Sequence, residues 1–236
     1  MLFGFSSKED LLSRARTQGN ASPKPYKKAV ELYYITRYFV SAFEARNHQI
    51  PLQVWNEYRN ALDHFFRHVT LPDHPEYSEQ LCLMENHIKR ACLDVIKLTC
   101  HKGDEWLVNK IEGYDQQALL IVDNGEFIKS FQERCNKARD LFLEAKTQDH
   151  NFGASVSENK KIVSMYIDAA FAFESLREEI DNKEPVILDR VLELQKITGQ
   201  AEGEARKKSF FPNVGASIVG AAIFTTLGAL AARFFG

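Results

Sequence analysis

Residues 81–98 read LCLMENHIKRACLDVIKL, and their apolar side chains recur at intervals of three and four positions. Because an α-helix turns once in about 3.6 residues, side chains at this spacing share one face of a helix. The stripe consists of Leu81, Met84, Ile88, Ala91, Val95 and Leu98. A helix that is apolar on one side needs a partner to cover that side. The stretch therefore predicts one helix of a helical bundle.

Two other parts of the chain carry the same pattern. One stripe consists of Ile162, Tyr166, Ala169, Phe173, Leu176 and Ile180. The other consists of Phe127, Phe131, Ala138, Leu141 and Ala145, widened by Ile128, Cys135 and Phe142. With turn and capping signals between them, these stripes predict helices near residues 25–47, 51–70, 74–101, 124–148 and 156–181, and a short helix from 104 to 122. The predicted fold class is all-α, a cytosolic bundle of about five to six helices followed by one C-terminal transmembrane helix.

The first of these helices is predicted to be central, because it is apolar almost all round. Its apolar side chains are Val30, Leu32, Tyr33, Tyr34, Ile35, Tyr38, Phe39 and Phe43. The whole chain is then predicted to comprise an N-terminal segment (1–24), the bundle (25–183), a helix and linker (184–209) and a transmembrane tail anchor (210–233).

The tail-anchor prediction depends on the uncharged run from Val214 to Ala232. As a helix it would span roughly 28 Å, close to the hydrocarbon thickness of about 30 Å. The alternative is an apolar C-terminal helix buried in a soluble bundle. Three cations, Arg206, Lys207 and Lys208, precede the run and Arg233 follows it. Since cations near a span stay on the cytoplasmic side, this prediction gives a single-pass membrane protein whose N-terminal domain is cytoplasmic.

Small side chains recur inside the same run. They are Ser217, Gly220, Ala221, Thr225, Gly228 and Ala229. Small residues at four-residue intervals let helices approach closely in lipid, so they predict packing between copies in the membrane. The expected partners are membrane lipid and either another protein or further copies of the chain.

Composition excludes several kinds of function. The net charge of −2 provides no broad basic face, so DNA is not an expected partner. Phosphate-binding glycine loops, nucleophile elbows and zinc-protease or calcium-loop motifs do not occur in the sequence. The four cysteines have no close pairing and are read as reduced, mostly buried side chains. No metal and no cofactor are predicted.

One short motif suggests catalysis. Arg59 and Asn60 are followed by His64, which gives the pattern R-N-x3-H. This pattern resembles the motif of the HEPN ribonucleases, R-x4-6-H, across six residues of the chain. The resemblance implies an all-helical bundle that pairs and cleaves RNA without a metal, with both side chains lining a cleft between two copies. A histidine there could move a proton at the 2′-hydroxyl, and an arginine could stabilise charge on the phosphate.

Two other interpretations of the same helix stay open. In a purely structural one, Val54, Tyr58, Leu62, Phe65 and Val69 form the core stripe, and Arg59 pairs with Asp63 one turn later. In the other, His64 and His68 begin a metal site. The sequence favours a tail-anchored interaction or assembly module as the function. The alternatives are a membrane-tethered HEPN-like ribonuclease, with RNA as its partner, and an effector that disrupts membranes when clustered.

Overall fold

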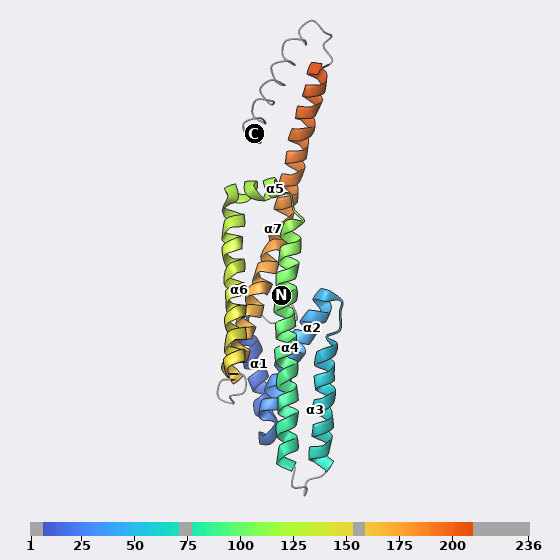
Figure 1. Ribbon diagram of the computed structural model, residues 1–236, viewed down its shortest axis with the longest axis vertical. Coiled ribbons are helices and arrows are strands. Elements are labelled where there is room, and N and C mark those ends of the chain that lie inside the picture. Colours follow the sequence, from blue (N-terminus) through green and yellow to red (C-terminus); the bar gives the residue numbers. More distant parts are fainter. Residues whose placement is uncertain (1–6, 71–76, 153–158, 210–236) are drawn as a thin grey trace, which may run out of the picture. The chain divides into compact units, whose positions relative to one another are not determined.

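The computed structural model describes residues 7–70, 77–152 and 159–209, and nearly all of these are helical (Figure 1). The α-helices of this described part are α1 (Lys8–Ala21), α2 (Lys27–Asn47), α3 (Leu52–Thr70), α4 (Tyr77–Glu112), α5 (Gln116–Ile121), α6 (Glu126–Phe152) and α7 (Asn159–Ser209). Two 3-10 turns, Lys24–Tyr26 and Val122–Gly125, precede α2 and α6. The all-α prediction is confirmed.

The transmembrane part of the fold prediction is contradicted and needs correction. Across the described residues, none of the helices combines the length and the apolar character needed to cross a membrane. The predicted anchor, residues 210–233, lies outside the described residues, together with its small-residue stripe. The descriptions transmembrane, tail-anchored and single-pass are therefore withdrawn. The physical reason within the described part is that its helices carry charged and polar side chains on their outer faces.

The first four helices form one side of the bundle. In Figure 1, α3 and α4 run side by side as an antiparallel pair, with α2 against α4. Toward α4, α3 presents Val54 and Ala61, which are both buried. The helix α1 packs on α2, where Gly19 is required for the close approach. A Cβ atom at Gly19 would lie 2.5 Å from Cγ of Glu31 and 3.0 Å from the carbonyl oxygen of Lys27.

The main core is formed by buried side chains of α1, α2, α4, α6 and the first part of α7. The predicted stripe of α7 is buried throughout, from Ile162 to Ile180. Tyr166 is fully buried, its ring lies 5.9 Å from that of Phe142 on α6, and its carbonyl is 4.0 Å from Sγ of Cys100 on α4. The stripes predicted for 81–98 and 127–145 also face inward. Periodicity therefore identified these three helices correctly.

Several boundaries differ from expectation. The predicted N-terminal segment contains α1, and α4 continues to Glu112 instead of ending near residue 101. The helix α7 continues through Pro185. A proline lacks the N–H that would bond one turn back, so a helix normally ends there. Ile180 and Ile187 are both fully buried, and their packing on either side of Pro185 keeps α7 helical.

The chain divides into two units, Met1–Ile187 and Leu188–Gly236. The described part of the second unit is the end of α7, in which Arg190 and Glu193 form an ion pair of 2.6 Å. The binding features described below belong to the first unit.

Candidate functional site

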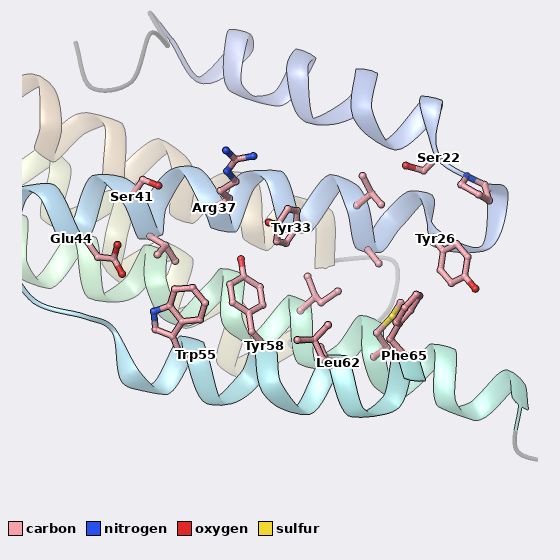
Figure 2. Close-up of a pocket in the computed structure, with 17 residues that line it drawn as sticks. Ser22, Tyr26, Tyr33, Arg37, Ser41, Glu44, Trp55, Tyr58, Leu62 and Phe65 are labelled. Carbon is pink, nitrogen blue, oxygen red and sulfur yellow. The ribbon is translucent and has the colours of Figure 1, made fainter. Parts of the chain in front are cut away.

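A groove with a volume of about 830 Å³ lies between α2 and α3, and α4 contributes to its lining. Figure 2 shows the side chains of the two helices converging on it. Most of its lining is apolar, and the aromatic members are Tyr26, Tyr33, Trp55, Tyr58 and Phe65. Pockets of this size and character bind small apolar ligands or the apolar side chains of a partner. The groove is therefore the leading candidate for a binding site.

The wall formed by α2 follows from its unusual composition. Buried residues such as Phe39 and Phe43 occupy one side of this helix. A second apolar stripe, which includes Val30 and Tyr33, lines the groove, and Tyr33 is 40% exposed. The prediction that the helix is central is thus correct for one side of α2 only. The other side is apolar because it lines an open groove.

The helix α3 carries two apolar stripes with different surroundings. Val54, Ala61 and the buried ring of His68 face α4. A second stripe lies about 100° around the helix, calculated at about 100° per residue. We refer to it as the α3 stripe, and it consists of Trp55 (48% exposed), Tyr58, Leu62 (54%), Phe66 (58%) and Val69 (44%). The predicted core stripe is therefore partly wrong, since Leu62 and Val69 lie at the surface.

Tyr58 lies at the centre of the groove and has an unusual environment. Its ring is 5.8 Å from that of Tyr33 and 5.7 Å from that of Trp55. Its hydroxyl points toward α2 (Figure 2) and is buried without a hydrogen-bond partner among the described residues. The hydroxyl of Thr36 lies near it and donates its own proton to the carbonyl oxygen of Leu32 at 2.7 Å. Burial raises the pKa of Tyr58 above its ordinary value, and the nearby Thr36 hydroxyl opposes this shift.

The residues of the R-N-x3-H pattern lie on different sides of α3. Arg59 is exposed, whereas His64 turns toward α4, where its Nδ1 is 2.8 Å from Oε1 of Gln80. The ring of His64 also stacks on that of His87, with 5.2 Å between centroids. Within one chain, Arg59 and His64 do not converge on a cleft. The ribonuclease interpretation, which places them between two copies, stays a prediction.

Two further polar residues of this helix, Asp63 and His68, have structural contacts. Asp63 forms its ion pair with Arg67, at 2.8 Å, where pairing with Arg59 had been expected. His68 is 1% exposed, and its Nδ1 lies 2.8 Å from the carbonyl oxygen of Tyr77. Asn60 is half-buried.

No metal site was expected in this helix apart from the open possibility at His64 and His68. Within residues 7–70, 77–152 and 159–209, groups of three or more histidine, cysteine or acidic side chains suitable for a metal are absent. Of the cysteines, Cys92, Cys100 and Cys135 are buried and Cys82 is exposed. The predicted basic cluster, Arg206, Lys207 and Lys208, lies near the end of α7.

Sequence reasoning missed the groove, although the sequence contains two signals of it. One was the excess of apolar residues around α2, and the other was the presence of both Trp55 and Phe66 outside the predicted core stripe of α3. Comparison with protein-family models, with curated proteins and with solved structures gives no match to this chain.

Proposed function

We propose that this chain is a helical assembly module that pairs with a second copy of itself through the α3 stripe. The observation that supports this most directly is the symmetry of the stripe. Its members lie at offsets of −7, −4, 0, +4 and +7 from Leu62, that is, at Trp55, Tyr58, Leu62, Phe66 and Val69. In a two-fold symmetric interface, each residue at a given offset meets the residue at the opposite offset in the partner. The stripe is self-complementary in this sense.

If two copies of α3 pack antiparallel with Leu62 on the symmetry axis, each side chain of the α3 stripe meets an apolar side chain of the other copy. Leu62 meets its own counterpart, Tyr58 meets Phe66 of a second copy, and Trp55 meets Val69 of a second copy. Between these levels, Arg59 comes opposite Phe65 of the second copy, where a guanidinium can lie over an aromatic ring. This register opposes no like charges along the stripe. Such pairing would cover the open side of the α2–α3 groove.

The strength of this association can be estimated from the exposed fractions. Each stripe side chain gains on average about 1 kcal/mol when its exposed part is buried, so the ten side chains of two copies gain roughly 10 kcal/mol. Association costs at least about 4 kcal/mol in lost translation and rotation. At most ~6 kcal/mol therefore remains, which corresponds to a Kd of about 40 µM or weaker. The proposed dimer is therefore weak and sensitive to protein concentration.

Sedimentation equilibrium at concentrations on both sides of this Kd tests the proposal. The wild-type chain should convert from monomer to dimer, and Leu62→Glu should remain a monomer. The substitution places two carboxylates against each other on the symmetry axis and weakens pairing by about 100-fold or more. Leu143→Glu provides the matched control, because Leu143 is a 64% exposed leucine on α6. A monomeric wild-type chain, or equal loss of pairing in the control, would refute the proposal.

A further inference from the structure

A second cavity, with a volume of about 330 Å³, lies on the other side of α2 and is surrounded by basic side chains. They are Arg16 of α1, Lys28 of α2, Lys89 of α4, and Lys160 and Lys161 of α7. Glu31 is the acidic side chain in the lining. Because these cations come from four helices, the fold and not one stretch of sequence brings them together. Their concentration is unusual in a chain whose net charge is −2.

The carboxylates near the cavity neutralise this charge only in part. Lys28 pairs with Glu85 at 3.0 Å, which lies outside the lining. Nζ of Lys160 is 3.9 Å from Glu31, and the Lys160 side chain is 81% exposed. An exposed ion pair at this distance contributes little. The lining itself contains five cationic side chains and one carboxylate, so positive charge is in excess there.

Lys89 is one of the partly buried cations of this lining. Burial lowers the pKa of its ammonium group, and the positive charges of Lys28 and Lys97 lower it further. The carboxylate of Asp149 opposes the shift. An anion in the cavity would interact favourably with the charged form of Lys89 and would offset the repulsion from its neighbours.

The floor of the cavity is apolar and preformed. It is made by Leu12, Ala15, Leu32, Ile35, Val163 and Ile167. Ile167 is fully buried and Ala15 is 2% exposed. Gly19 lets α1 approach α2 at Glu31, which is itself part of the lining. A rigid apolar floor beneath a basic rim suits a ligand with one apolar part and one anionic part.

We propose that this cavity binds a small amphiphilic anion, a phosphate or carboxylate group carrying a short apolar chain. The anionic group would lie among Lys28, Lys89 and Lys161, and the chain would contact the floor at Leu12 and Leu32, its partly exposed members. A cavity of this size lies at the lower end of the range for small-molecule sites, about 300 to 1,000 Å³, which limits the length of the chain. This site is separate from the proposed pairing face and does not depend on it.

Calorimetric titration of the full chain with monomeric octyl phosphate tests the proposal. Wild type should bind it at one saturable site. Lys89→Gln combined with Lys161→Gln should raise the Kd roughly tenfold or more, because hydrogen bonds to charged groups are among the stronger ones. The matched control is Lys129→Gln combined with Lys137→Gln on α6, which makes the same change in net charge at exposed positions. This control should bind like wild type.

Two further experiments identify the class of the ligand and its source. Inorganic phosphate should bind more weakly than octyl phosphate, because it leaves the apolar floor empty. Cosedimentation with phosphatidylcholine vesicles, with and without phosphatidic acid, separates the two sources of such a ligand. If vesicle binding requires phosphatidic acid and is lost in the Lys89/Lys161 variant, the ligand is a membrane lipid. If the protein binds octyl phosphate but not the vesicles, the ligand is a free molecule. Absence of saturable octyl phosphate binding, equal losses in the control, or equal affinity for inorganic phosphate would overturn the proposal.

Discussion

Removing the hydroxyl of Tyr58 should make the protein more stable. This hydroxyl is buried in the groove without a hydrogen-bond partner among the described residues, and a buried polar group in that state costs about 1 to 3 kcal/mol. Tyr58 is only partly buried as a whole, so the lower end of that range applies. We expect Tyr58→Phe to raise the free energy of unfolding by about 1 kcal/mol.

Tyr166 provides a matched comparison within the same chain. Its ring is also buried, but its hydroxyl donates to Oδ2 of Asp149 at 3.2 Å. The same substitution there, Tyr166→Phe, removes a hydrogen bond to a charged group and should lower the free energy of unfolding by about 1.5 kcal/mol. The two tyrosine-to-phenylalanine changes should therefore have opposite signs.

Urea unfolding followed by circular dichroism measures both effects. Each substitution is placed in the Leu62→Glu background, so that dimerisation does not contribute to the apparent stability. The slope of the transition should stay constant and its midpoint should shift. If Tyr58→Phe lowers the free energy of unfolding as much as Tyr166→Phe does, the Tyr58 hydroxyl has a partner and the reasoning fails.

Three other predictions concern packing, pH and catalysis. Gly19→Ala should lower the free energy of unfolding in urea by about 1 kcal/mol. The clash of the new methyl group with α2 costs about 1 to 3 kcal/mol, which exceeds the gain in helix propensity of about 1 kcal/mol. An unchanged urea midpoint would show that α1 can move away from α2. Burial raises the pKa of the Cys92 and Cys100 thiols from 9.0 to about 12, so the unfolded chain loses these protons first. The free energy of unfolding should then fall above pH 9 by about 1.4 kcal/mol per pH unit for each thiol. Cys92→Ala removes one of these thiols and should reduce the slope. An unchanged slope in Cys92→Ala would contradict the raised pKa of Cys92. If the HEPN-like interpretation holds, purified protein cleaves RNA and either Arg59→Ala or His64→Ala abolishes cleavage, whereas cleavage that survives both changes excludes these residues.

Periodicity predicted the parts of the fold whose apolar face meets another helix. The stripe ending at Ile180 is buried as expected, because spacing alone determines which side of a regular helix is apolar. The continuation of α7 past Pro185 could not be predicted in this way. It depends on tertiary packing at Ile187, and local sequence rules favour a break there.

The candidate sites were harder to predict because they depend on how the helices are turned. In α3, a rotation that directs Ala61 and His68 toward α4 leaves Leu62 at the surface, and either orientation fits an apolar periodicity. The basic cavity depends on cations from four separate helices, such as Lys28 and Lys161, whose proximity has no signature in the sequence. Composition gave only an indirect indication of the groove, in the apolar residues that surround α2.

Disulfide crosslinking at position 62 tests the proposed pairing most directly. Leu62→Cys is prepared in a Cys82→Ser background, because Cys82 is the exposed member of the four cysteines. A disulfide requires Cα atoms about 4.4 to 6.8 Å apart, a separation that two closely packed helices reach on the symmetry axis. Mild oxidation should give a covalent dimer with Leu62→Cys and none with Asp63→Cys, which points about 100° away on the same helix. The two-fold pairing of α3 would be contradicted if both variants crosslinked equally, or if Leu62→Cys remained a monomer after oxidation.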